Sequence, residues 1–390
     1  MRLSERIKSI KPSATLAINA KAQQLRARGA RITSLAVGEP DFATPAHVKD
    51  AAKAAIDQDF TKYTAEAGIP ELRRAVAGYF QRFYGAVAPM EAVTVTNGGK
   101  QSLYNLFQAL LDPGDEALIP APYWLSYPDM VLLAGGAPVI VPTDPGNDFL
   151  AGIDDLERRT TKKTRLLILN SPSNPTGCHY GAARLLELAE WAKSRGVFVV
   201  SDEIYDQLVY APAEPCSLSP WWEKNPECCA VVNGLAKSFA MTGWRVGYTL
   251  AHPDLIKAMG TLQGQSTSNV CSPAQKAALA ALTGPWDFPA ALREAFHRRR
   301  DLALEIVNTW PGVVCPKPDG AFYLFPSVAA RYTAAVADST AMCARILEEA
   351  QVAVVPGAAF GDDRCLRFSY AVADDVLAEA LTRVGKVLAA

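Results

Sequence analysis

The chain has 390 residues, of which 49% are hydrophobic, and its 39 basic residues nearly balance 40 acidic ones, so the formal net charge is −1. This composition supports a globular protein with one large domain or two ordinary ones, and it excludes disordered, collagen-like and coiled-coil chains. The balanced charge argues against a nucleic-acid-binding protein, which normally carries a basic excess.

Cysteine usage and the N-terminal segment bear on the compartment. The eight cysteines form no C-x-x-C pair, and only four histidines are present. This pattern predicts buried free thiols in a reducing compartment and no metal site. Residues 1–29 mix charges with short apolar runs, so they contain no signal peptide, and no run reaches the roughly 18 apolar residues of a membrane span. We therefore expect a soluble, cytoplasmic protein.

Short apolar runs alternate with helical stretches from about Val48 to Leu282. The runs predict strands at 92–96, 116–121, 137–142, 164–170, 196–202, 229–234 and 245–251. Helices are predicted between several of them, at 100–111, 123–136 and 181–196. Runs that are apolar on both faces and separated by helices indicate a largely parallel α/β sheet, in which ligands gather at the carboxyl ends of the strands.

The segment TGPWDFP at 283–289 interrupts this alternation. Beyond it the pattern predicts a long helix at 290–310, extended segments at 320–328, 352–361 and 365–371, a helix around 338–350 and a C-terminal helix. Elements of this size suggest a second, smaller α+β domain. We expect a large domain at 48–285 and a small domain formed by 1–47 and 286–390, with an N-terminal arm and a site at the interface.

Two cations stand out in the segment 231–248, which otherwise carries little charge: Lys237 and Arg245. Burial lowers the pKa of a lysine and makes its amine a nucleophile, and a guanidinium suits a phosphate group. The alternative is a turn that exposes both cations to solvent.

Three polar residues follow strand candidates. Asp202 ends one strand, so its carboxylate can point into the crevice at the edge of the sheet, where it needs a cationic partner. A pyridinium nitrogen is one such partner, and Tyr205 could reach a neighbouring ring oxygen. Alternatively, Asp202 caps a following helix. Asn174 lies in the Pro- and Asn-rich loop 170–177, where it can offer an amide to a ligand or belong to an ordinary turn.

The remaining candidates suit anions and rings. Gly99 and Lys100 begin a helix, where backbone amides form an anion site, although the loop is neither a Walker A motif nor a dinucleotide fingerprint. Trp124 can stack on a planar cofactor or belong to the core. Arg367, inside an apolar strand, needs an anion such as a carboxylate. Together these groups match what a pyridoxal phosphate enzyme requires for its cofactor and an amino-acid substrate.

The chain resembles the class I, fold-type I aminotransferases, and within them the bacterial aspartate aminotransferase subgroup. The matching motifs run nearly end to end: KPSAT (11–15), VGEPDFATP (37–45), KYTAEAGIPELR (62–73), GGKQ (98–101), PYWLSYPDM (122–130), NSPSNPTG (170–177), SDEIY (201–205), NGLAKSFAMTGWRVGY (233–248), QSTSN (265–269), GAFY (320–323), VAVVPGAAFG (352–361) and LRFSYA (366–371). The resemblance implies an α/β fold whose large domain holds a mostly parallel seven-stranded sheet between helices, beside a small α+β domain.

The resemblance also implies residue roles toward pyridoxal 5′-phosphate. Lys237 would hold the cofactor as a Schiff base and move the proton between substrate and cofactor. The other cofactor contacts would be Asp202 to the pyridinium nitrogen, Tyr205 and Asn174 to the phenolic oxygen, Trp124 to the ring face, and Arg245 with the amides near Gly99 and Lys100 to the phosphate. Gly234 stands where many members carry Ser or Thr, so the phosphate site would lack one hydroxyl.

Substrate contacts follow from the same resemblance. Arg367 and the backbone at Gly38 would clamp the α-carboxylate, assisted by Asn174 and Trp124. Lys100, with Ser13 or Thr15, is the candidate contact for the distal end of a dicarboxylate, although Lys100 could instead support only the phosphate. Tyr63 matches a tyrosine that the family lends across a dimer interface to the partner's phosphate, which implies a homodimer.

The expected reaction is a ping-pong transfer of the amino group of L-aspartate to 2-oxoglutarate, giving oxaloacetate and L-glutamate. The alternative substrates are aromatic amino acids, prephenate or arogenate, or a broad set, because a single lysine with hydroxyls discriminates loosely. A nicotinamide dehydrogenase is disfavoured by the missing glycine fingerprint. A DNA-binding regulator on this fold is disfavoured because only 36 residues precede VGEPDF, fewer than a domain normally needs.

Overall fold

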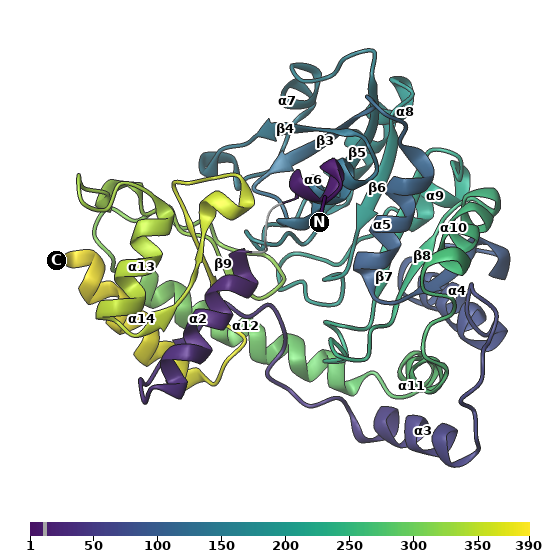
Figure 1. Cartoon of the computed structure of the whole chain (residues 1–390), viewed down its shortest axis with the longest axis horizontal. Helices are drawn as coiled ribbons and strands as arrows, with labels where there is room; N and C mark the ends of the chain where they lie inside the picture. The colour runs from purple at the N-terminus through teal and green to yellow at the C-terminus, as the bar shows by residue number, and fades with distance from the viewer. Residues whose placement is uncertain (11–13) are drawn as a thin grey trace.

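The computed structural model describes residues 1–10 and 14–390 (Figure 1). In this part of the chain, seven strands form one sheet in the order β2-β8-β7-β6-β5-β3-β4. The strands are β2 (Val93–Thr96), β3 (Glu116–Ala121), β4 (Ala137–Pro142), β5 (Thr164–Asn170), β6 (Phe198–Asp202), β7 (Cys229–Gly234) and β8 (Gly247–Leu250). Only β8 runs antiparallel to its two neighbours. The mostly parallel seven-stranded sheet expected from the sequence is thus confirmed.

Helices cover both faces of this sheet. One face packs its apolar side chains against α5 (Gly99–Leu110), α6 (Ser126–Leu133) and α10 (Pro253–Ser266). The other face packs against α4 (Pro70–Tyr84), α8 (Gly181–Ser194), α9 (Ser219–Lys224) and α11 (Ser272–Thr283). Every residue of β2, β7 and β8 is consequently buried, including the polar residues Thr94, Thr96, Asn233 and Thr249.

Several element bounds differ from the sequence prediction. The predicted helix at 123–136 shortens to α6, and the long helix α12 (Asp287–Val307) begins three residues earlier than expected. Helices α4, α10 and α11, with α2 (Ala14–Ala27) and α3 (Ala46–Asp57), were not predicted. Proline stands in the first turn of α4, α10 and α11, and this helix-start signal could have found them.

The C-terminal third forms a smaller α+β layer around α12. Its three-stranded sheet has the order β11-β12-β9, from β9 (Tyr323–Leu324), β11 (Val355–Pro356) and β12 (Leu366–Ser369). The helices α13 (Ser339–Glu349) and α14 (Asp374–Ala389) pack beside it (Figure 1). The small α+β part is confirmed, although the extended segments predicted at 320–328 and 352–361 contain only two-residue strands.

The N-terminal segment joins this smaller part. Strand β1 (Thr33–Ser34) pairs in parallel with β10 (Val352–Ala353), and Leu35 belongs to the apolar cluster around α12. The same cluster includes Tyr205, Leu208 and Tyr210, so its packing crosses the predicted domain boundaries. Those boundaries stay a prediction. The remaining short helices are α1 (Glu5–Lys8), α7 (Ile153–Glu157) and the 3₁₀ turns Met90–Ala92, Pro145–Asn147, Ala329–Arg331 and Gly357–Phe360.

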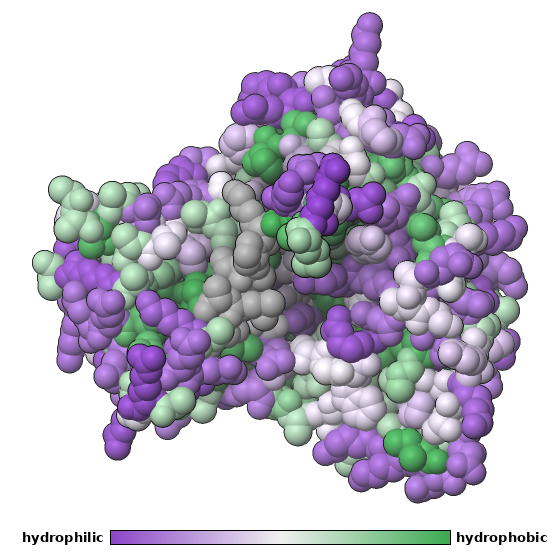
Figure 2. All heavy atoms as spheres, in the orientation of Figure 1, coloured by the Kyte–Doolittle hydropathy of each residue, from purple (hydrophilic) through white to green (hydrophobic). Residues whose placement is uncertain are grey.

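The cysteines and the surface complete the description. All eight cysteines are free, but only Cys178, Cys229, Cys343 and Cys365 are buried, while Cys271 is exposed, so the prediction of buried thiols was wrong in part. Within residues 1–10 and 14–390, every helix is too short or too polar to cross a membrane. The face shown in Figure 2 is mostly hydrophilic, its apolar patches are small and separate, and it is hollowed near the centre.

Candidate active site

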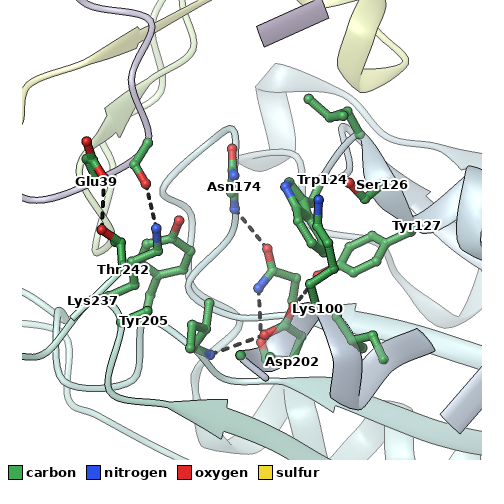
Figure 3. A pocket seen from close by; sticks show the side chains of 18 of the residues that line it. Glu39, Lys100, Trp124, Ser126, Tyr127, Asn174, Asp202, Tyr205, Lys237 and Thr242 are labelled. Carbon is green, nitrogen blue, oxygen red and sulfur yellow. Dashed lines mark hydrogen bonds between the residues drawn. The ribbon is translucent and has the colours of Figure 1, made fainter. Parts of the chain in front are cut away.

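A cavity of about 540 Å³ opens at the carboxyl ends of the central strands, between the large sheet and the smaller part. Ten of the residues predicted from the sequence line it: Gly38, Gly99, Lys100, Trp124, Asn174, Asp202, Tyr205, Lys237, Arg245 and Arg367. Figure 3 shows that side chains from the N-terminal segment, from the loops after the strands and from α5 and α6 point into the same space. The fold therefore brings together groups that lie up to 329 residues apart in sequence, from Gly38 to Arg367.

Asp202 ends β6 and is buried beneath this cavity. Its Oδ2 accepts a hydrogen bond from the Tyr127 hydroxyl at 2.7 Å, and its Oδ1 accepts from the backbone N–H of Ile204 at 3.3 Å (Figure 3). Burial raises the pKa of Asp202 to about 6, and the hydrogen bond from Tyr127 opposes this shift. A turn rather than a helix follows Asp202, so the helix-cap alternative is wrong.

Lys237 lies in the loop between β7 and β8. Its Nζ donates a hydrogen bond to the backbone oxygen of Gly38 at 2.5 Å and lies 5.7 Å from the ring centroid of Tyr205. Burial lowers the pKa of Lys237 to about 8, and the charge of Arg367 acts in the same direction. An amine with this pKa is partly neutral near physiological pH, as a nucleophile or base requires. The alternative, a turn that exposes both cations, is therefore wrong for Lys237, whereas Arg245 is exposed.

Arg367 on β12 is 2% exposed and faces the cavity. Its Nη1 donates to Asn174 Oδ1 at 2.9 Å and its Nη2 to the backbone oxygen of Ala36 at 2.7 Å. Among the described residues, none accepts a hydrogen bond from the buried Nε of Arg367. A buried guanidinium with two neutral acceptors and a spare donor could bind an anion, and its role toward a carboxylate stays a prediction.

Tyr205 is 3% exposed, and its hydroxyl lies 2.8 Å from the hydroxyl of Tyr323 on β9. The Tyr323 ring also faces the Arg367 guanidinium, with 4.6 Å between the ring centroid and Cζ. The hydroxyl of Tyr323 would lie 2.8 Å from a Cβ built on Gly38. Only glycine fits at position 38, so its backbone can approach the ligand space closely.

The loop before α5 and the segment before β8 form the predicted phosphate side of the cavity. Gly98 has a φ of +84°, and a Cβ there would lie 2.5 Å from Arg245 Nη2, so only glycine lets this guanidinium cover the loop. Arg245 itself is exposed and donates to the backbone oxygens of Thr242 at 2.8 Å and Asn97 at 3.2 Å. The first amides of α5 point to the same side, which suits an anion.

Gly234 stands where the resemblance favours a hydroxyl side chain. A Cβ at this position would lie 3.1 Å from Gly247 Cα and from the Val246 backbone oxygen. Strands β7 and β8 pair closely here, with Gly234 opposite Gly247. A side chain at position 234 would therefore have to separate two closely packed glycine backbones, which explains why no hydroxyl side chain stands there.

Lys100 and Trp124 mark the outer end of the cavity. The Lys100 Nζ lies 4.9 Å from the ring centroid of Trp124, a cation–π contact. Burial of part of the side chain lowers the pKa of Lys100, and the nearby charge of Arg245 adds to this effect. Lys100 is nevertheless exposed, so it remains accessible to a ligand that enters the cavity.

Three predicted residues are not placed at this cavity. Tyr63 is 88% exposed and lies elsewhere on the surface. Ser13 lies outside the described residues, and Thr15 falls in α2 at a position whose side chain is not described. Their predicted roles stay predictions.

Sequence reasoning missed four residues that organise the site. Tyr127 binds Asp202, Tyr323 binds Tyr205, and Ala36 binds Arg367 through its backbone. Asn170 accepts from the Asn174 backbone N–H at 2.9 Å and donates to the Asp202 backbone oxygen at 3.0 Å. Tyr127, Asn170 and Tyr323 belong to motifs that carried the resemblance, so their positions inside those motifs were the available signal.

The donor set fits pyridoxal phosphate. Lys237 offers a primary amine of lowered pKa, Asp202 a buried carboxylate for a protonated ring nitrogen, and Tyr205 a hydroxyl for a ring oxygen. Arg245 with the start of α5 offers a cationic cradle for a phosphate, and the Trp124 ring borders the space between these groups. A buried carboxylate needs a cation of this kind, and a ring N–H supplies it.

Comparison with known proteins identifies the family. A family described as "Aminotransferase class I and II" matches residues 30–384. The aspartate/prephenate aminotransferase of Cereibacter sphaeroides is 48% identical over 392 residues, which cover 98% of this chain and 97% of the relative. The aspartate aminotransferase of Streptomyces avermitilis is 45% identical, and the match covers 99% of this chain and 96% of that relative. The structure of the Thermus thermophilus aspartate aminotransferase with maleate matches at a TM-score of 0.93 and 45% identity, covering 99% and 100% of the two chains.

The chain therefore belongs to the class I and II aminotransferases, a family of enzymes that use pyridoxal phosphate. Within this family it is an aspartate aminotransferase-like enzyme, since aspartate and aspartate/prephenate aminotransferases are both among its relatives of nearly full length. The family and the fold expected from the sequence are confirmed.

Proposed function

We propose that this enzyme transfers the amino group of L-aspartate to 2-oxoglutarate and releases oxaloacetate and L-glutamate. The observation that carries the proposal is the presence of two cation sites in one cavity, the buried Arg367 and the exposed Lys100. Aspartate, glutamate and both oxo acids carry two carboxylates, one for each cation. The maleate in the Thermus thermophilus structure is also a dicarboxylate, which supports the choice.

Arg367 binds the α-carboxylate of each substrate in this proposal. Its Nε is buried and has no partner among the described residues, and its two other donor groups hold Asn174 and Ala36 in place. The backbone at Gly38 and the Asn174 and Trp124 side chains complete the contact. Lys100 binds the distal carboxylate, and Ser13 or Thr15 assists it.

Pyridoxal phosphate, when bound, supplies the electron sink that makes the α-proton of an amino acid acidic. Asp202 holds a proton on the ring nitrogen, and its link to Tyr127 keeps the carboxylate oriented. Tyr205 and Asn174 bind the phenolic oxygen, while Arg245 and the amides at Gly99 and Lys100 bind the phosphate.

Lys237 anchors the cofactor and then takes the proton from the substrate α-carbon. Its neutral amine is available for this step because burial lowers its pKa to about 8. The single α-carboxylate site serves amino acids and oxo acids in turn, which supports a ping-pong sequence. Oxaloacetate leaves before 2-oxoglutarate enters.

A second candidate keeps the chemistry and widens the substrate set to prephenate, arogenate or aromatic amino acids. The 48% identical relative from Cereibacter sphaeroides is named an aspartate/prephenate aminotransferase. Lys100 is exposed and contacts the Trp124 ring, so the outer end of the cavity presents an aromatic face as well as a charge. An aromatic substrate has a surface to pack on there.

Half-reactions of the holoenzyme test the choice, with the cofactor spectrum followed against aspartate, glutamate, phenylalanine and arogenate. We expect aspartate and glutamate to give the highest kcat/KM. Lys100→Ala should lower kcat/KM for aspartate by about 10- to 100-fold, the worth of one charge-assisted contact. The kcat/KM for phenylalanine should stay within about threefold of the wild-type value. Lys53→Ala, at an exposed lysine of α3, is the control. Aspartate reacting no faster than phenylalanine would reject the proposed substrate.

We also propose a homodimer in which Tyr63 of each protomer reaches the phosphate in the partner's site. The motif KYTAEAGIPELR supports this role through its resemblance to the family, and the 88% exposed Tyr63 side chain is accessible to a partner protomer. We further propose the domain division at 48–285 against 1–47 with 286–390. The cytoplasmic location stays a prediction.

A further inference from the structure

Arg299 on α12 lies outside the cavity and is 6% exposed. Its guanidinium binds two carboxylates that belong to opposite ends of the chain. The Nη1 and Nη2 groups donate to Asp41 Oδ1 at 2.7 Å and Oδ2 at 3.0 Å, and Nε donates to Asp374 Oδ1 at 3.0 Å. One buried cation thereby joins residues 333 positions apart.

Asp41 ends the segment that forms one side of the α-carboxylate site. Within this segment the backbone oxygen of Ala36 accepts from Arg367, and the backbone oxygen of Gly38 accepts from Lys237. Asp41 follows Gly38 by only three residues, so its attachment to Arg299 limits where the Gly38 backbone can lie. Phe42 adds to the anchor, since its ring centroid lies 5.4 Å from the Arg299 Cζ.

Asp374 anchors the other side of the same site. It is the first residue of α14, five residues after Ser369, the last residue of β12, which carries Arg367. The connection between β12 and α14 is therefore short, and its far end is attached to Arg299. Both chain segments that form the α-carboxylate site are tied to one guanidinium.

The chemistry of this contact makes it rigid. A guanidinium binds a carboxylate through two parallel hydrogen bonds in a fixed plane, which a lysine cannot reproduce. Burial lowers the pKa of Arg299, but the hydrogen bonds that Asp41 and Asp374 accept from the guanidinium outweigh this effect and raise the pKa overall. The cation therefore stays charged, and breaking its contact with Asp41 leaves that carboxylate without its cation, whereas Asp374 is also bound by Arg298.

We propose that Arg299 is a positioning residue that sets the spacing between the Gly38 backbone and Arg367, and so the affinity for the α-carboxylate of every substrate. The inference rests on the proposed role of Arg367 and Gly38 as the α-carboxylate site. It does not depend on which amino acid the enzyme prefers, because all of them carry this group.

The test compares three variants of the holoenzyme: Arg299→Gln, Asp41→Asn and Arg298→Gln. Arg298 is the matched control, since it precedes Arg299 on α12 and binds Asp374 Oδ2 at 3.0 Å but makes no contact with Asp41. Steady-state KM and kcat are measured with two amino acids that react in the wild type, one acidic and one neutral. Thermal unfolding is followed in parallel.

We expect Arg299→Gln and Asp41→Asn to raise KM for both amino acids by a similar factor of about 10 to 100, the worth of one charge-assisted contact to the α-carboxylate, while kcat changes by less than about fivefold. Arg298→Gln should leave KM within about twofold. This pattern separates positioning from stability, because a merely structural role lowers the unfolding temperature and leaves the KM of the folded enzyme unchanged.

Three outcomes would overturn the inference: a wild-type KM in the folded Asp41→Asn variant, a loss confined to the acidic amino acid, or an equal loss in Arg298→Gln. Asp41→Asn decides the question even if Arg299→Gln fails to fold. If the wild type prefers another amino acid than aspartate, the proposed substrate fails and this inference is still tested with the amino acids that react.

Discussion

Burial moves the pKa values of the two central ionisable groups toward each other. The pKa of Lys237 falls to about 8 and that of Asp202 rises to about 6, because burial disfavours both charged forms. Neither group pairs directly with the other by a hydrogen bond in the described structure; Lys237 binds Gly38, and Asp202 binds Tyr127. Each group is thus free for the separate role that we propose for it, the amine of Lys237 toward the substrate and the carboxylate of Asp202 toward a ring nitrogen.

Replacement of Lys237 tests the first of these functions. Lys237→Ala should abolish transamination, with a loss of at least about 10³-fold, since the variant lacks both the anchoring amine and the base. The fold should persist because the truncation removes a costly buried cation. Circular dichroism checks the fold, and the cofactor spectrum with added amino acid checks the reaction. Turnover at the wild-type rate would disprove the assignment.

A second buried carboxyl group lies directly after Asp202. Glu203 is fully buried, and its Oε1 accepts from the Ser201 hydroxyl and the Leu218 backbone N–H, both at 2.8 Å. Within the described part of the chain, no group donates to its Oε2. Burial raises the pKa of Glu203 to about 8, opposed first by a hydrogen bond with Ser217 and then by those with Leu218 and Ser201. We therefore expect the side chain to be mostly protonated at neutral pH.

This proton makes stability depend on pH. Between its ordinary pKa of 4.5 and about 8, Glu203 binds a proton in the native state and not in the unfolded state, so the free energy of unfolding falls as pH rises. Glu203→Gln removes this contribution. Between pH 5 and pH 7, the free energy of unfolding of the variant should therefore fall by about 2–3 kcal/mol less than that of the wild type. Urea unfolding at several pH values measures the difference.

Glu187→Gln on α8 is the control for this measurement. Glu187 is exposed, and its carboxylate accepts a hydrogen bond at 2.9 Å from Arg184 of the same helix. Its replacement should leave the pH dependence of stability as in the wild type. A Glu203→Gln profile parallel to the wild-type profile would show that Glu203 is ionised in the native state.

At the scale of elements, the phosphate side depends on how closely β8 approaches the start of α5. A Cβ on Gly247 would lie 2.3 Å from the Gly99 backbone nitrogen and 2.5 Å from the Gly98 carbonyl carbon. Backbone atoms cannot move aside as a flexible side chain can. A side chain at position 247 must therefore displace the helix start that offers its amides to the phosphate.

Gly247→Ala should consequently weaken binding of pyridoxal phosphate to the cofactor-free enzyme by about 10-fold or more. Gly243→Ala is the matched control, since a Cβ there has no heavy atom within 4 Å among the described residues. The dissociation constants come from titration of the intrinsic fluorescence. Equal affinity in both variants would mean that α5 does not depend on this packing.

At the scale of the whole molecule, the proposed dimer can be tested by mixing inactive chains. Each site would need Lys237 from one protomer and Tyr63 from its partner. Lys237→Ala and Tyr63→Phe chains, unfolded and refolded together in equal amounts, should form intact sites at about a quarter of all positions, and activity should exceed that of either parent. Activity equal to the sum of the separately refolded parents would reject shared sites.

The strands were predictable where a short apolar run lies between turns. The bounds of β3, β4, β5 and β7 match such runs in the sequence. Uniform burial is not required, since the edge strand β4 has exposed ends and only Val141 is buried. Helices α2 and α3 were missed because most of their apolar residues are alanines, which give little hydrophobic contrast along the sequence. The antiparallel direction of β8 has no signal in its residues, since direction depends on the connecting path.

The candidate site was predictable where a residue type is costly unless it is used. Lys237, Asp202 and Arg367 lie in apolar segments, and a buried charge demands a partner. Tyr127 and Tyr323 were missed because a buried tyrosine fits a core equally well. Arg299 was missed because it lies in a run of three arginines at 298–300. The sequence has no feature that distinguishes the exposed Arg298 from the buried Arg299.

The sequence by itself determined the family, the chemical groups of the site and the strands of the sheet. These depend on residue identity and on local pattern, which the chain carries directly. Only the tertiary structure decided which groups meet, as Arg367 and Ala36 do. It also decided the direction of the pKa shifts of Asp202 and Glu203, and the burial of the charge on Arg299. These properties depend on distance and desolvation, and both arise from segments that are remote in the chain.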